Sequence, residues 1–151
     1  MFPNNAMLPP LAGKRLPPLS EARIKARNAG IGAVSVAKIL CVDDDEVVLL
    51  GAQALLGNRF EIFTATSGAA GLELMDSIRP EWVVVDYQMP IMDGARFMLQ
   101  ARQSGHRAKF ILLTGLDVGR LDWEGLNPLG LVGHLRKPLD AGRLLEMLEG
   151  A

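Results

Sequence analysis

Short apolar runs alternate with longer stretches of helical periodicity along most of the chain, starting at Lys38. The runs KILCV, FEIFTA, WVVVD and KFILLT contain few polar residues, and GLVGHL near the end of the chain is a weaker fifth run. Such runs are typical of strands buried on both faces of a parallel sheet, whereas a half-exposed strand would alternate apolar and polar residues. The pattern therefore predicts five parallel strands.

The stretches between these runs carry apolar residues three and four positions apart, which places them on one face of a helix. The expected faces are Val48, Ala52, Leu55 and Leu56, then Gly71, Leu74, Met75 and Ile78 behind an N-cap at Ser67, then Gly94, Phe97, Met98 and Ala101, and finally Ala141, Leu144, Leu145 and Leu148. The segment 115–130 carries four glycines and Pro128, which predicts a short or irregular fourth helix. Strands that alternate with helices in this way predict an α/β fold, a doubly wound five-stranded parallel sheet.

Composition divides the chain into two parts. Residues 1–19 contain five of the nine prolines, and residues 1–38 carry six Lys or Arg but one Glu. Residues 39–151 carry ten Lys or Arg and sixteen Asp or Glu, so the body is acidic. We therefore expect a basic, proline-rich flexible extension over residues 1–37 and one globular domain over residues 38–151.

Several classes of protein are disfavoured by the same composition. No apolar run approaches the roughly 20 residues that span a bilayer, and prolines interrupt the N-terminal region where a signal peptide would need an apolar core. Cys41 is the only cysteine, which excludes an internal disulfide and favours a cytoplasmic location. The acidic body makes direct DNA binding unexpected.

Polar side chains follow the apolar runs at the places where the predicted strands end. The first run ends in Asp43, Asp44 and Asp45, the third in Asp86, the fourth in Thr114, and the fifth is followed by Lys137. Because the carboxyl ends of parallel strands meet at one edge of the sheet, these side chains should lie together. Carboxylates at close range repel one another unless a cation neutralises them, and Mg²⁺ prefers oxygen ligands. With a lysine and a hydroxyl nearby, the cluster predicts a pocket for a phosphoryl group.

Residues 38–149 resemble the receiver domain of two-component response regulators. The resemblance is carried by ILCVDDDE at the first strand, VVVDYQMPIMDG at the third, ILLTG at the fourth, and LRKPLD after the fifth. It implies a receiver-type, flavodoxin-like fold in which Asp86 accepts a phosphoryl group from a histidine kinase or a histidine phosphotransfer protein. The chain would then act as a single-domain regulator, either by switching the binding of a partner protein or by relaying the phosphoryl group to a histidine, and not as an enzyme.

The resemblance also assigns roles to the other site residues. Asp44 and Asp86 would bind Mg²⁺ through their carboxylates, the backbone carbonyl of Gln88 would be a third ligand, and Asp43 would act through water. Thr114 would hydrogen-bond the bound phosphoryl group, and Lys137 would pair with it across a cis Lys137–Pro138 bond.

One position departs from the family pattern. Three residues before its lysine the family usually has Tyr or Phe, and this chain has His134. His134 is therefore a candidate switch residue, with an ordinary surface imidazole as the alternative. Asp45 is interpreted as the start of the first helix, and Trp123 as either a half-buried residue or an anchor for a partner.

Two other functions fit parts of the sequence. A haloacid-dehalogenase-type phosphohydrolase would share ILCVDDDEV and ILLTG, but it needs a further acidic motif after the lysine, where Asp140 is the only aspartate, and it leaves Asp86 without a role. A pure interaction module with an unused acidic site is the other alternative. Phosphorylation of Asp86 by a small acyl phosphate distinguishes both from a receiver.

Overall fold

The structure is a computed structural model that describes residues 36–115, 119 and 121–150. The predicted flexible extension over residues 1–37 therefore lies almost wholly outside the described residues. No helix in the described part of the chain is long and apolar enough to cross a membrane.

Strands and helices alternate along the described chain as the apolar pattern predicts. The strands are β2 (Lys38–Val42), β3 (Glu61–Ala65), β4 (Trp82–Asp86), β5 (Lys109–Thr114) and β6 (Leu131–Arg136). The helices are α2 (Glu46–Leu56), α3 (Gly68–Ile78), α4 (Gly94–Gln103), α5 (Trp123–Leu126) and α6 (Ala141–Gly150), with a 3₁₀ turn η2 (Asn127–Leu129) after α5.

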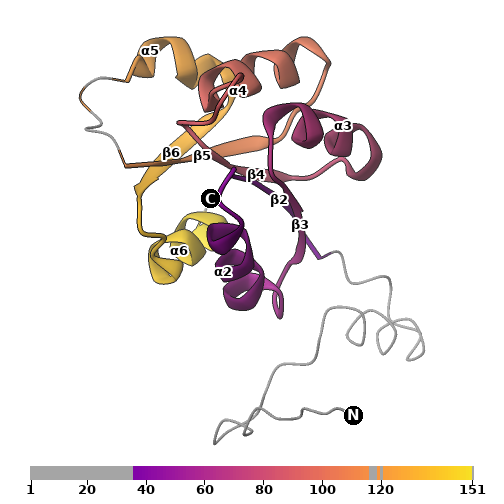
Figure 1. Cartoon of the computed structure of the whole chain (residues 1–151), viewed down its shortest axis with the longest axis vertical. Helices are drawn as coiled ribbons and strands as arrows, with labels where there is room; N and C mark the ends of the chain where they lie inside the picture. The colour runs from indigo at the N-terminus through magenta and orange to yellow at the C-terminus, as the bar shows by residue number, and fades with distance from the viewer. Residues whose placement is uncertain (1–35, 116–118, 120, 151) are drawn as a thin grey trace, which may run out of the picture.

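The strands form one parallel sheet in the order β3-β2-β4-β5-β6. The chain first moves outward from β2 to β3, then crosses back to β4 and continues in the other direction (Figure 1). The order therefore reverses between β2 and β4. In sheets of this kind, ligands bind beyond the carboxyl ends of the strands at such a switch point.

Helices cover both faces of the sheet, and each face has its own apolar core. Figure 1 shows α2 and α6 on one face and α3, α4 and α5 on the other. Leu49, Ala52, Leu144 and Leu148 pack against one face of the sheet, and Met75, Phe97, Met98 and Leu126 against the other. Strand β4 is buried along its whole length, which is why its sequence contains no alternation of apolar and polar residues.

Side-chain caps fix where three of the helices begin. The carboxylates of Asp45 and Asp93 and the hydroxyl of Ser67 accept hydrogen bonds from the first-turn N–H groups of α2, α4 and α3 respectively. The N-cap predicted at Ser67 is confirmed, as is the interpretation of Asp45 as the start of a helix.

The buried face of α2 differs from the predicted one. Leu55 is 51% exposed and Val48 only partly buried, whereas Leu49 joins Ala52 and Leu56 in the core. The prediction failed because α2 carries apolar residues on all sides, so that the spacing alone does not single out one face.

The predicted short fourth helix is confirmed, because α5 spans four residues and is followed directly by η2. Arg102 holds this segment in place. Its Nε donates to the carbonyl of Leu129 at 2.6 Å, and its other guanidinium nitrogens donate to the carbonyls of His106 and Ala108. The side chain of Arg102 thus joins the end of η2 to the loop between α4 and β5.

Candidate functional site

Asp86 is the last residue of β4, and its side chain lies at the carboxyl end of the sheet, beside the switch point. The residue is 3% exposed. Its Oδ1 accepts a hydrogen bond from the N–H of Gln88 at 3.1 Å, so the loop turns close to the carboxylate. The loop closes where the N–H of Gly94 donates to the carbonyl of Tyr87 at 2.8 Å. A Cβ at position 94 would lie 2.8 Å from the carbonyl oxygen of Asp86, so glycine lets α4 begin this close to the strand.

Two further acids come from the end of β2. Asp43 is 1% exposed, and its Oδ1 accepts a hydrogen bond from the N–H of Asp45 at 2.8 Å. Asp44 is exposed. One carboxylate oxygen from each of Asp43, Asp44 and Asp86 lies within 4.8 Å of the others, so the predicted cluster is brought together. Asp45 instead turns toward α2 and caps it.

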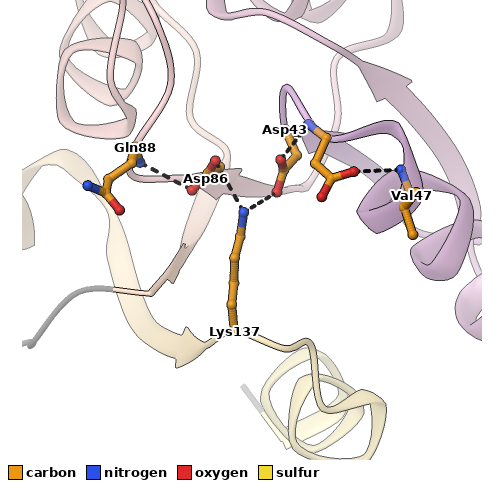
Figure 2. Close-up of polar contacts among 6 residues, drawn as sticks. Asp43, Val47, Asp86, Gln88 and Lys137 are labelled. Atoms are coloured by element: carbon orange, nitrogen blue, oxygen red, sulfur yellow. Dashed lines mark hydrogen bonds and ion pairs between the residues drawn. The ribbon is translucent and has the colours of Figure 1, made fainter.

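Lys137 lies between the two buried carboxylates, as Figure 2 shows. Its Nζ is 2.9 Å from Asp43 Oδ2 and 3.2 Å from Asp86 Oδ2. Burial lowers the pKa of the Lys137 ammonium, but the hydrogen bond to Asp43 and the charges of both acids outweigh burial and raise it overall. The resemblance implies that Lys137 pairs with a phosphoryl group, and this bridge between the two acids was not predicted. The predicted cis Lys137–Pro138 bond is present.

The electrostatics of the site disfavour an ionised Asp86. Burial raises the pKa of Asp86 from 3.8 to about 6, and the charge of Asp43 acts in the same direction. Lys137 and the N–H of Gln88 lower the pKa but do not compensate. The one ammonium group therefore does not offset the combined effect of burial and of the Asp43 charge on the pKa of Asp86.

The acid cluster fits a hard divalent cation. Asp43 Oδ2 is buried, and the Lys137 ammonium lies 2.9 Å from it as an ion pair. Three carboxylates from two strand ends offer the oxygen ligands that Mg²⁺ prefers, and exposed Asp44 leaves room for water in its shell. The backbone carbonyl of Gln88 stays a predicted ligand.

Thr114 ends β5, the strand beside β4, and is fully buried. Its carbonyl accepts the N–H of Lys137 at 3.0 Å, which ties the lysine to the end of this strand. In the register between the strands, Asp86 lies opposite Leu113, one residue before Thr114. Thr114 therefore belongs to the same edge of the sheet as Asp86, and the contact of its hydroxyl with a phosphoryl group stays a prediction.

His134 lies in β6, where it pairs with Leu112, and its side chain is partly buried. Its ring packs against the indole of Trp123, with centroids 4.8 Å apart and an angle of 38° between the planes. The sequence pattern singled out both residues but did not pair them, because they lie in different elements, α5 and β6, and no single periodicity relates their side chains. Trp123 is partly buried, as one of its two interpretations requires.

The fold and the site define a class of protein: a doubly wound α/β domain with three carboxylates and a lysine at its switch point. The chain belongs to the response regulator receiver domain family, whose model matches residues 39–149. This finding confirms the resemblance noted in the sequence and leaves the haloacid-dehalogenase alternative without support.

Relatives with response-regulator functions match the same part of the chain. Response regulator MprA of Mycolicibacterium vanbaalenii is 34% identical over 109 residues, which cover 72% of this chain and 47% of that protein. Regulatory protein AtoC of Escherichia coli is 34% identical over 113 residues, 73% of this chain and 24% of that protein. The chain thus spans about half the length of MprA and about a quarter of AtoC.

Solved structures show the same fold. The signal receiver domain of an HD domain-containing protein from Pseudomonas fluorescens Pf-5 aligns with a TM-score of 0.71 at 30% identity, covering 78% of this chain and 94% of that one. The chemotaxis response regulator CheY4 of Vibrio cholerae aligns with a TM-score of 0.69 at 25% identity, covering 77% and 98%.

Proposed function

We propose that Asp86 accepts a phosphoryl group from a phosphohistidine of a sensor histidine kinase or a phosphotransfer protein, and that phosphorylation switches the binding of a partner protein. The position of Asp86 carries this proposal. It is a buried carboxylate at a strand end, with two further acids in its cluster and Lys137 at 3.2 Å. The chain acts as a phosphoacceptor and has no separate substrate to turn over.

In the transfer, the P–N bond of the phosphohistidine breaks and an oxygen of Asp86 forms the new P–O bond. The imidazole leaves with the electron pair of the broken bond. Lys137 is placed to neutralise the phosphoryl oxygens, because its ammonium already lies between Asp43 and Asp86. Thr114, at the end of the neighbouring strand, supplies a hydroxyl donor.

Asp43, Asp44 and Asp86 would hold Mg²⁺, with Asp43 acting through water and the carbonyl of Gln88 as a further ligand. The bound ion would supply positive charge to the transferring phosphoryl group. The raised pKa of Asp86 supports this assignment, since a bound cation would offset both the burial of the carboxylate and the charge of Asp43.

The test is phosphorylation of the chain by a small acyl phosphate in the presence of Mg²⁺, followed by mass spectrometry. We expect the wild type to gain one phosphoryl group on Asp86. The Asp86→Asn protein should gain none, because its amide has nearly the same volume but is not a nucleophilic carboxylate.

A matched control comes from the same loop. Asp93 is exposed and caps α4, a role that asparagine also fills, so Asp93→Asn should be phosphorylated like the wild type. Full phosphorylation of the Asp86→Asn protein would place the acceptor elsewhere. A wild type that gains no phosphoryl group would support the alternative of an unphosphorylated interaction module.

A further inference from the structure

A second concave site lies at the opposite end of the sheet from Asp86. A cavity of about 630 Å³ opens where β4 and β5 begin, between the end of α3 and the loop that follows α4. Buried Pro80, Trp82 and Ala108 contribute apolar surface to its lining. Its volume falls in the range of cavities that hold small molecules.

Three cations from two separate segments line this cavity. Arg79 comes from the end of α3, where its backbone adopts the left-handed conformation, and Arg107 and Lys109 come from the start of β5 and the loop before it. All three side chains are exposed, and the Lys109 ammonium lies 5.1 Å from the centroid of the Trp82 ring. Positive charge is thus concentrated here, although the body of the chain is acidic.

None of these three cations has a carboxylate partner among the residues that the structure describes. The ion pairs found there join Arg59 to Glu149, His106 to Asp76, and Lys137 to Asp43 and Asp86. Cations on a convex surface need no partner because water solvates them. Here, three of them border one concavity, so a single anion is able to contact more than one.

The acids near the cavity are already engaged. Glu81 is the one carboxylate in its lining, and its Oε1 accepts the N–H of Lys38 at 3.1 Å. Asp76 Oδ1 lies 2.9 Å from Nε2 of the buried His106 ring and accepts its N–H in the tautomer that carries the proton on Nε2. Among the described residues, the rim therefore offers a ligand three cations without a carboxylate partner, against one carboxylate that is hydrogen-bonded to the backbone.

We propose that this cavity binds a small polyanion of the phosphorylated-metabolite class. Two or more anionic groups would contact Arg79, Arg107 and Lys109, and the carbon skeleton would lie against Pro80 and Trp82. Arginine suits this role because its planar fork of donors matches two phosphate oxygens at once. This site shares no residue with the phosphoacceptor site, so the proposal stands independently of the proposed function.

The test is a titration of the full chain with inorganic pyrophosphate in EDTA, followed by ¹⁵N NMR. We expect saturable shifts at residues 79–82 and 105–109. Arg107→Glu should weaken binding by about tenfold or more, since it replaces an attraction with a repulsion. Arg143→Glu makes the same charge change at an exposed position on α6 and should leave the affinity nearly unchanged. The Asp86→Asn protein should bind like the wild type.

Three results would overturn the proposal. If Arg107→Glu and Arg143→Glu weaken pyrophosphate binding equally, the net charge of the protein alone explains the effect. Shifts confined to residues 43–45, 86–88 and 137 would show that the anion binds at the phosphoacceptor site. If the wild type shows no saturable shifts at roughly millimolar pyrophosphate, the cavity does not bind the anion with a millimolar or tighter dissociation constant. Unchanged resonances away from residue 107 establish that the Arg107→Glu protein is folded.

Discussion

At the scale of single residues, the buried carboxylate of Asp86 makes stability depend on pH. The folded-state pKa of Asp86, about 6, lies above the reference value of 3.8, so the folded protein holds this proton more tightly than the unfolded chain does. The resulting stabilisation is fully present below pH 3.8 and is lost as the pH rises through about 6. At neutral pH in metal-free buffer, ionised Asp86 therefore lowers the free energy of unfolding.

Asp86→Asn should accordingly stabilise the fold at pH 7 in EDTA by about 1–2 kcal/mol, because the amide carries no charge to desolvate. The gain should shrink steadily below pH 6 and vanish near pH 4, where Asp86 of the wild type is protonated. Urea denaturation of both proteins at several pH values measures it. A gain in unfolding free energy that is the same at pH 4 and pH 7 would show that the ionisation of Asp86 does not cause it.

At the scale of elements, the short α5–η2 segment depends on the contact between Arg102 and the chain at Gly130. Gly130 has a positive φ of 98°, and a Cβ there would overlap a guanidinium nitrogen of Arg102 and lie 3.2 Å from the carbonyl oxygen of Ala108. Arg102 cannot move aside without giving up hydrogen bonds to three carbonyls. Glycine at position 130 thus permits the guanidinium to hold η2 and β6 against α4.

Gly130→Ala should therefore destabilise the protein more than Gly105→Ala does. Gly105 also has a positive φ, 90°, but a Cβ there would meet nothing within 4 Å, so its substitution costs only the backbone strain, about 1–2 kcal/mol. We expect Gly130→Ala to cost a further 1–3 kcal/mol or so, since it breaks partly buried hydrogen bonds to a charged group. Equal losses of unfolding free energy in urea would show that the Arg102 contacts add nothing.

At the scale of the whole molecule, Mg²⁺ should stabilise the fold by mass action, because its ligands come together only in the folded state. At ten times its dissociation constant the ion adds about 1.4 kcal/mol, which corresponds to a rise in Tm of roughly 5 °C. Asp44→Ala should abolish most of this rise. Asp45→Ala should lower the Tm by removing the cap of α2 but keep the rise. Thermal unfolding of both variants with Mg²⁺ and with EDTA distinguishes the loss of a metal ligand from the loss of a helix cap. An equal rise in Tm in both variants would show that Asp44 does not bind the ion.

The sequence predicted the architecture because the runs of β2, β4 and β5 have the length and composition of strands buried on both faces, and because strand and helix patterns alternate along the chain. It predicted that Asp43, Asp44, Asp86, Thr114 and Lys137 share one edge, because parallel strands end at the same edge. The same reasoning failed for α2, whose apolar residues surround the helix. It could not find the Trp123–His134 pair or the Arg102 contacts, because these join residues of different elements, and no single period relates one position to the other.

Side chains of opposite charge gather at the two ends of the sheet in the described domain, where Lys137 offsets part of the acidic charge and Glu81 part of the basic charge. Asp43, Asp44 and Asp86 lie at the carboxyl end, and Arg79, Arg107 and Lys109 at the amino end. The five residues of β4 separate the two groups by roughly 16 Å. An approaching protein with a basic surface is therefore turned toward Asp86 before contact, and one with an acidic surface toward the other end. Added salt weakens this orientation, since the Debye length is about 8 Å at physiological ionic strength.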